Sequence, residues 1–403
     1  MDILDCLRDE AQWQLFYEYK VSCGNTPEWL LKQLRQYIDQ KRYLAVADRI
    51  DAGEPFPPPK KTAISKLHSE KKRIVYTYPH DENFALKLIN YLLLRRYDDL
   101  FAHNLYSFRA NSCVAHAIRD IAGKRHVRDM WVYKVDIHDY FNSIPVDRLL
   151  PMLEQVLSGE PKLYRFLASL LLDGRVNDNG VIVPEKKGIM AGTPISTFLA
   201  NLYLRDMDAM FQSQNRIYAR YSDDIIIFAS TQEQLEQDIT TIRTWLENAG
   251  LEINPRKESR TSPGEKWVFL GVSYLDGSVD VAPVSVEKIK AKMRRKTRAL
   301  KRWADRKKVP GIFAAKAFIK TFNRKLFQSE GAHELTWARW YFPLITTADS
   351  LHVIDEYAQS CIRYLATGKR TKAAYNFRYE HMKELGYISL VNAYYRYCRG
   401  LEY

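Results

Sequence analysis

The stretch IYARYSDDIIIF, at residues 217–228, sets two acidic residues between two apolar segments. Short segments rich in β-branched and aromatic residues on both sides of a polar pair are typical of a β-hairpin. Asp223 and Asp224 would then lie in the turn, where adjacent negative charges repel each other and neither is cheaply buried. A bound divalent cation would relieve both costs, and a turn exposed to solvent would avoid them. The pair alone does not decide between these two interpretations.

A third carboxylate favours the cation. The segment 131–135 (WVYKV) predicts a strand that ends at Asp136. If this strand lies beside the 217–228 hairpin, Asp136 and Asp223 meet at one end of a sheet. Mg²⁺ prefers oxygen ligands, and two such ions about 3.5–4 Å apart can catalyse phosphoryl transfer. The sequence therefore predicts a site for two Mg²⁺ ions, with Mn²⁺ as the alternative metal.

Apolar periodicity predicts helices at both ends of the chain. Near the start, apolar residues recur at spacings of three and four, at Leu4, Leu7, Ala11 and Leu15. A proline-rich linker follows at 51–59, where stacked prolines cannot donate backbone hydrogen bonds. Residues 285–403 are predicted to be helical and basic, with one apolar face formed by Ile289, Met293, Leu300 and Trp303.

The middle of the chain alternates between strands and helices. Asn179-Gly180 is a hairpin turn signal, and residues 231–249 form a periodic helix followed by Gly250 in the position of a helix C-cap glycine. Another short strand is predicted at 267–272. This order predicts an α+β fold in which a small antiparallel sheet is backed by helices.

Composition limits the class of protein. The 403 residues are 46% apolar, which allows a large core and excludes disorder of the whole chain. A net charge of +13 points to a polyanionic partner, with nucleic acid as the first candidate. The five cysteines are scattered and form no CxxC pair, so a reducing compartment is expected. With no signal peptide and no apolar run of ~20 residues, we expect a soluble cytoplasmic protein without membrane contact.

Six segments, in order, resemble the motifs of reverse transcriptases. The resemblance covers roughly residues 70–275. The segments are YSFRANS (106–112) in the fingers, VDIHDYFNSI (135–144) as motif A, GIMAGTPISTFLANLYL (188–204) as motif B, YSDD (221–224) as motif C, GLEINPRK (250–257) as motif D and FLG (269–271) as motif E.

This resemblance implies a right-hand polymerase fold with fingers, a ferredoxin-like palm and an α-helical thumb. The expected domains are an N-terminal helical extension and linker (1–59), fingers (60–130), palm (131–284, with a finger insertion around 150–187) and thumb with the C-terminal region (285–403).

The resemblance also assigns roles to single residues. Asp136, Asp223 and Asp224 would be the catalytic metal ligands, and the backbone at Ile137 would also face a metal. Phe141 matches the steric gate, whose ring fills the space of a ribose 2′-OH and favours dNTPs.

Five further positions would handle the nucleotide or the template. Lys71, Arg73 and Arg109 would pair with the triphosphate or the template backbone, and Lys257 would protonate the leaving pyrophosphate. Each of these charges could instead be an ordinary solvated surface group. Gly192 fits a loop that passes close under the nascent pair.

Two positions depart from the family pattern in motif B. Ala191 stands where most relatives have Gln, and Thr197 replaces the usual Pro. Neither change touches metal binding, but both bear on processivity, fidelity and template use.

Among reverse transcriptases, the chain resembles the bacterial defence-associated lineage, formerly an unknown group, related to retron and group II intron enzymes. It has no NAxxH motif, and ATG at 366–368 is a poor match to the retron VTG. The segment 384–395 (ELGYISLVNAYY) and the motif B loop resemble the type 2 kind. Such enzymes copy a structured non-coding RNA into cDNA, giving an RNA/DNA duplex, in anti-phage defence.

Other interpretations remain open at this point. They are a template-independent or protein-primed polymerase on the same fold, a retron-type reverse transcriptase, and an RNA-binding scaffold without catalysis. The intact aspartates argue against the scaffold. The sequence does not indicate the oligomeric state.

Overall fold

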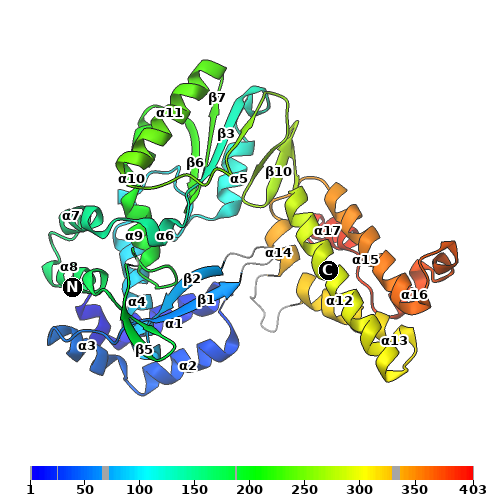
Figure 1. Cartoon of the computed structure of the whole chain (residues 1–403), viewed down its shortest axis with the longest axis horizontal. Coiled ribbons are helices and arrows are strands. Elements are labelled where there is room, and N and C mark those ends of the chain that lie inside the picture. Colours follow the sequence, from blue (N-terminus) through cyan, green and yellow to red (C-terminus); the bar gives the residue numbers. More distant parts are fainter. Residues whose placement is uncertain (1, 25, 66–71, 187, 329–335, 403) are drawn as a thin grey trace. The chain divides into compact units, whose positions relative to one another are not determined.

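The computed structural model describes residues 2–24, 26–65, 72–186, 188–328 and 336–402. Figure 1 shows the course of the chain, which divides into two compact units, residues 1–263 and 264–403. Among the described residues, the first unit has helices and two sheets, and the second has helices and one sheet. The division into fingers, palm and thumb that the sequence predicts stays a prediction.

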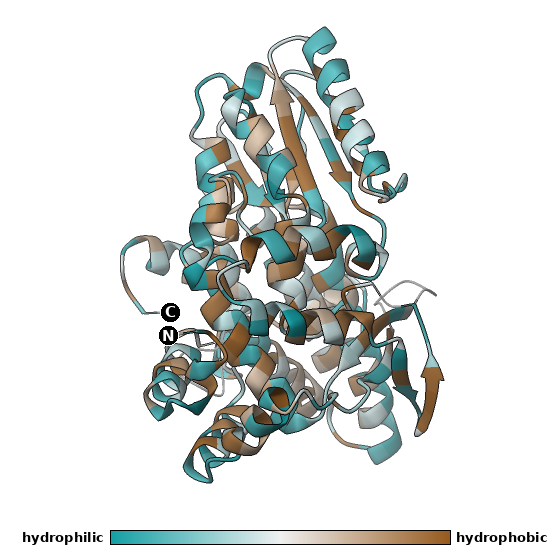
Figure 2. Ribbon diagram, turned by 90° about the vertical axis from the view of Figure 1, so that its left-hand side faces the viewer, coloured by the Kyte–Doolittle hydropathy of each residue, from teal (hydrophilic) through white to brown (hydrophobic). Residues whose placement is uncertain are grey.

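The central sheet of the 1–263 unit has the strand order β6-β7-β3-β8, and all of its neighbouring strands are antiparallel. Its strands are β6 (Ile217–Tyr221), β7 (Asp224–Ala229), β3 (Trp131–Asp136) and β8 (Ser259–Thr261). Residues 225–229 of β7 are all buried, and apolar strands appear brown in Figure 2. The predicted hairpin, the strand beside it and the small antiparallel sheet are confirmed.

Helix α11 (Gln232–Asn248) packs against β3 and β7 and backs this sheet. The Thr231 side chain accepts a hydrogen bond from the Gln234 backbone N–H, which caps the start of the helix. Gly250 follows the helix with φ 69°, a left-handed conformation that glycine adopts at little cost. The bounds and the C-cap glycine agree with the sequence prediction.

A second sheet, with strand order β2-β1-β4-β5, lies in the same unit. Its strands are β1 (Lys60–Ser65), β2 (Lys72–Thr77), β4 (Arg175–Asp178) and β5 (Val181–Pro184). Asn179 and Gly180 both have positive φ, 52° and 96°, as a two-residue hairpin turn requires. The predicted turn is therefore confirmed, and strands β4 and β5 share a sheet with β1 and β2.

Helices surround both sheets of this unit. They are α1 (Glu10–Ser22), α2 (Glu28–Asp39), α3 (Tyr43–Asp51), α4 (His80–Arg96), α5 (Val114–Ala122), α6 (Tyr140–Ser143), α7 (Val146–Val156), α8 (Pro161–Leu172), α9 (Ser196–Tyr203) and α10 (Arg205–Ser213), with 3-10 turns η1 (Asp5–Arg8), η2 (Asp98–Leu100) and η3 (Val127–Asp129).

The predicted apolar stripe at the start of the chain is wrong. Asp9 accepts a hydrogen bond from the Ala11 backbone N–H and starts α1 at Glu10, so the residues before it belong to a separate 3-10 turn. Leu15 is 50% exposed, whereas Trp13 and Phe16 are fully buried. The cap shifts the register of the helix, and aromatic residues rather than the predicted leucine face the core.

The 264–403 unit contains an antiparallel sheet with strand order β11-β10-β9 and a group of helices. These elements are β9 (Trp267–Phe269), β10 (Val272–Leu275), β11 (Ser278–Val281), α12 (Pro283–Lys307), α13 (Gly311–Leu326), α14 (Trp337–Tyr341), α15 (Asp349–Thr367), η4 (Lys372–Asn376), α16 (Tyr379–Glu384) and α17 (Leu390–Cys398). The predicted basic helix is confirmed as α12. It buries Ile289, Met293 and Leu300, while Trp303 stays partly exposed.

A buried carboxylate holds the C-terminal segment in place. Asp355, 5% exposed on α15, accepts hydrogen bonds from the Tyr387 hydroxyl (2.8 Å) and the Ser389 hydroxyl (2.6 Å). It also accepts from the backbone N–H groups of Leu390 and Val391, at 2.9 and 3.1 Å. The start of α17 is thus fixed on α15, because a buried carboxylate is stable only when its oxygens are satisfied.

The described helices and the cysteines bear on membrane crossing and on disulfide bonds. Among the described residues, no helix combines the length and the apolar character that a bilayer crossing needs. All five cysteines are free thiols, so no disulfide framework is present.

Candidate active site

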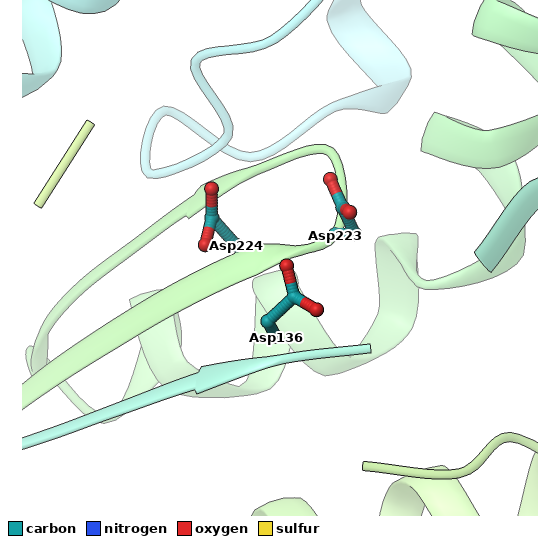
Figure 3. Close-up of side chains that lie close together, drawn as sticks. All are labelled: Asp136, Asp223 and Asp224. Atoms are coloured by element: carbon teal, nitrogen blue, oxygen red, sulfur yellow. The ribbon is translucent and has the colours of Figure 1, made fainter. Parts of the chain in front are cut away.

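Asp136, Asp223 and Asp224 meet at one end of the central sheet (Figure 3), with ligand oxygens within 4.8 Å of one another. Asp136 ends β3 and lies opposite Asp224, the first residue of β7. Asp223 lies in the turn between β6 and β7, and its carbonyl accepts a hydrogen bond from the Ile137 backbone N–H at 3.0 Å. The pairing of β3 with the hairpin, which the sequence analysis required, brings the three carboxylates together.

The turn that carries Asp223 is strained and firmly held. Ser222 has φ 61°, a conformation that costs non-glycine residues free energy. Its backbone N–H donates to the Ser107 hydroxyl at 2.9 Å, and its carbonyl accepts from Arg220 at 3.3 Å. Ser107 belongs to the YSFR segment, so this motif supports the acidic turn directly.

Arg220 is itself wholly buried beneath the turn. Its guanidinium forms an ion pair with Asp208, which is also fully buried, through contacts that include 2.9 and 3.1 Å. The Tyr218 hydroxyl donates to the same carboxylate at 2.9 Å, and Arg220 donates to the Asn201 carbonyl at 3.2 Å. This network ties β6, α9 and α10 to the acidic turn.

Lys257 and Asn254 hold Asp136 from the other side. The Lys257 ammonium donates to one oxygen of Asp136, and the Asn254 amide donates to the other at 3.2 Å. Burial alone would lower the pKa of Lys257, but its hydrogen bond to Asp136 and the charges of the three aspartates raise it. Lys257 therefore lies beside the carboxylates in its charged form, as a proton donor requires.

The ionised forms of the other two aspartates, Asp223 and Asp224, are electrostatically unfavourable without a bound cation. Burial, and then the charge of Asp136, raises the pKa of Asp223, while burial and the charge of Asp223 raise the pKa of Asp224 to about 6. Neither forms an ion pair with any residue that the structure describes. Closely spaced carboxylate oxygens that lack cations are the donor set that a divalent metal ion prefers, so the residues fit Mg²⁺ or Mn²⁺.

Three of the predicted nucleotide-binding residues line one cavity of about 480 Å³. Arg73, Phe141 and Gly192 contribute to its wall, and Phe141 is partly buried there. The charge of Arg73 also acts on Asp223. This volume is in the range of small-molecule binding sites.

Gly192 lies where the motif B loop passes against β2. Its φ is 99°, and a Cβ there would come within 3.1 Å of the Tyr76 carbonyl oxygen and of Val75 Cβ. The neighbouring Ala191 is buried, its carbonyl accepts from the Tyr76 N–H at 2.8 Å, and its N–H donates to the Asn142 side chain at 3.1 Å. Only glycine suits position 192 without displacing β2.

The remaining predicted residues are placed differently. Lys71 lies outside the described residues. Arg109 is engaged with Asp98, at 2.8 Å from Nε and 2.8 Å from Nη2, and donates to the Ala102 carbonyl at 2.8 Å. In this structure Arg109 thus stabilises its own loop, and its contact with a triphosphate stays a prediction. Thr197, in place of the usual Pro, bonds Asn90 of α4 at 3.1 Å.

Two lysines that no sequence motif singles out also line the cavity that contains Arg73. Lys20 of α1 and Lys87 of α4 both contribute to its wall. Burial, and then the charge of Lys20, lowers the pKa of Lys87 to about 8. The available signal was a single lysine inside the apolar run 84–94, since a charged residue in such a run is rarely without a role.

Comparison with known families identifies the chain. Residues 59–274, more than half of the 403, match the reverse transcriptase (RNA-dependent DNA polymerase) family. The chain belongs to this family. The right-hand polymerase fold predicted from the sequence is the fold of reverse transcriptases, and the three aspartates lie within the matched region.

One curated relative is a bacterial retron enzyme. The chain is 22% identical to the Retron Ec86 reverse transcriptase of Escherichia coli over 172 residues, which cover 42% of this chain and 50% of that protein. The chain thus spans about half the length of this relative.

Solved telomerase structures also resemble the chain. Telomerase from Candida albicans, in complex with a TWJ fragment of telomeric RNA, is 12% identical with a TM-score of 0.47, covering 88% of this chain and 71% of that one. Truncated apo telomerase from Candida tropicalis is 15% identical with a TM-score of 0.45, covering 56% and 55%.

Proposed function

We propose that the protein is an RNA-directed DNA polymerase that uses two divalent metal ions at Asp136, Asp223 and Asp224. The observation that carries this proposal is the meeting of the three carboxylates within 4.8 Å at the end of the central sheet, in a chain of the reverse transcriptase family. Bound there, two Mg²⁺ ions would neutralise the charge that develops during phosphoryl transfer.

The surrounding residues have separate tasks in this proposal. The cation of Arg73 attracts the triphosphate of the incoming dNTP into the cavity. Lys257, charged beside Asp136, supplies a proton to the leaving pyrophosphate. Ser107 and Arg220 hold the acidic turn rigid, so that the carboxylates are in place before substrate binds.

Phe141 is proposed to exclude ribonucleotides. Its ring packs edge-on against Phe108, with 6.2 Å between centroids, and forms part of the cavity wall. Replacing Phe141 with Ala removes the bulk that would meet a 2′-OH, so rNTP incorporation relative to dNTP incorporation should rise by roughly 10-fold to 100-fold. Single-nucleotide extension with each of the two substrates measures this ratio.

Phe313→Ala is the matched control, because it removes the same ring from an exposed position of α13, in the 264–403 unit. An unchanged ratio in Phe141→Ala, with dNTP incorporation retained, would contradict the role as a gate.

We also propose that the template is a structured non-coding RNA and that synthesis serves anti-phage defence in the cytoplasm. A net charge of +13 and the resemblance to defence-associated enzymes support a nucleic-acid partner of this kind. The match to a retron reverse transcriptase supports an RNA template more generally.

Sequencing the nucleic acid that co-purifies with the protein from its host, with and without DNase and RNase, tests the template. One abundant RNA with complementary DNA is the expected result. DNA that matches no RNA would favour a template-independent or protein-primed polymerase. Ala191 supports the template-independent alternative. Its buried methyl group stands where most reverse transcriptases have a Gln, whose amide would contact the nucleotide or the adjacent strand.

A further inference from the structure

A second cationic cavity, of about 290 Å³, lies in the 264–403 unit between α12, α15 and residues 369–375. We call it the thumb pocket. Its lining includes five cations, Arg294, Arg298, Arg363, Lys369 and Arg370. No acidic residue in the described part of the chain lines it. Nothing in the polymerase reaction described above uses it.

Tyrosines, rather than carboxylates, orient three of these arginines. The Arg363 guanidinium lies 4.8 Å from the ring centre of Tyr375, and that of Arg370 lies 4.4 Å from the ring centre of Tyr364. Arg294 donates from Nε to the Tyr357 hydroxyl at 3.2 Å. Aromatic contacts fix the direction of a guanidinium but leave its charge uncompensated.

The floor of the pocket is small and neutral. Thr297, Cys361 and Ala374 are buried there, and burial raises the pKa of the Cys361 thiol, which keeps it protonated. All the charge of the pocket is therefore carried by its walls and is positive.

Unlike the cations of the thumb pocket, two other basic residues of α12 form ion pairs. Lys290 pairs with Glu287 at 2.7 Å, and Lys301 pairs with Asp305 at 2.5 Å. The five cations of the thumb pocket form no ion pair with any residue in the described part of the chain. Uncompensated like charges gathered around a cavity repel one another unless an anion binds.

We propose that the thumb pocket binds the phosphomonoester of a nucleotide. A phosphomonoester carries about −1.5 to −2 charges at neutral pH, whereas the phosphodiester inside a strand carries one, so five cations suit the monoester. Tyr375, 66% exposed at the pocket, offers a ring on which the attached base can stack. The ligand is thus a free mononucleotide or the phosphorylated end of a nucleic-acid strand.

Binding assays without metal ions or dNTPs test this inference separately from polymerase activity. The probes are labelled 12-nucleotide RNAs with a monophosphate at the 5′ end, at the 3′ end or at neither end, together with free AMP and inorganic phosphate. Each is titrated with the full-length protein, and RNA affinity is read from fluorescence anisotropy and AMP or phosphate affinity from calorimetry.

The test variant is the double substitution Arg298→Ala/Arg370→Ala. Its matched control, Arg295→Ala/Lys372→Ala, removes the same charge from exposed positions of α12 and of residues 369–375 that lie outside the pocket. Thermal unfolding checks that both variants fold. Tyr375→Ala, at an exposed position, is a second variant that keeps all five cations.

A terminal phosphate should strengthen RNA binding by on the order of 10-fold in the wild type and the control, and not in the double variant. If the double variant weakens AMP binding, and a terminal phosphate does not change RNA binding, the ligand of the pocket is a free nucleotide. Tyr375→Ala should remove the preference for AMP over inorganic phosphate. If neither phosphorylated RNA nor AMP depends on the pocket residues, the proposal is overturned.

Discussion

Replacing Asp223 with Asn should lower the rate of dNTP incorporation by on the order of 10³-fold or more, because the amide keeps the shape of the side chain but cannot neutralise a divalent cation. Primer extension on an RNA template at saturating Mg²⁺ measures the rate. The fold should not suffer in the same variant. Burial and the charge of Asp136 raise the pKa of Asp223, so its ionised form already costs stability at neutral pH. We therefore expect the free energy of unfolding without metal to stay constant or to rise.

Asp99→Asn is the control for this substitution, since Asp99 is an exposed aspartate of η2 away from the triad. Its rate should stay within a factor of two of the wild type, as expected for a surface change. Synthesis by Asp223→Asn within tenfold of the wild-type rate would falsify the assignment of Asp223 as a metal ligand.

Replacing Arg220 with Met should destabilise the protein by about 3–5 kcal/mol, because it leaves the fully buried Asp208 without its cation. The Ser222 and Asn201 carbonyls also lose their donor. The shift of the urea unfolding midpoint measures the loss. Adding Asp208→Asn should restore part of the stability, since the uncompensated charge is then gone while an acceptor for Tyr218 remains.

The matched control is Lys32→Met, which breaks the exposed pair between Lys32 and Glu28. An exposed ion pair contributes at most about 1 kcal/mol, so the midpoint should hardly move. Equal effects of Lys32→Met and Arg220→Met would contradict the view that the acidic turn rests on a buried ion pair.

The three carboxylates of the candidate site follow from the sequence because each lies at the end of a strand with a strong apolar pattern. Once 131–136 and 217–228 are read as neighbouring antiparallel strands, Asp136 and the acidic turn must share one sheet edge. Local signals of the same kind predict the Asn179-Gly180 turn and the cap at Gly250.

Contacts that depend on the tertiary structure could not be predicted in this way. Asp208 and Arg220 lie on a helix and a strand whose local patterns do not reveal their pairing, and the buried pair appears only when these elements pack. The sequence likewise predicts Arg109 as a nucleotide ligand, because its ion pair with Asp98 forms only in the folded loop. At the start of the chain, one capping residue, Asp9, decides which apolar residues face the core.

The contact between β2 and the motif B loop has a mechanical consequence. The Tyr76 backbone bonds the Ala191 carbonyl, and the Tyr76 hydroxyl bonds Glu185 at 2.8 Å, so both ends of the segment 185–191 are tethered to one residue of the strand. A displacement of β2 would therefore carry Ala191 and the neighbouring Gly192 with it. The wall of the cavity at Gly192 would shift with β2, and the same loop also bonds the Asn142 side chain in the segment that follows Asp136.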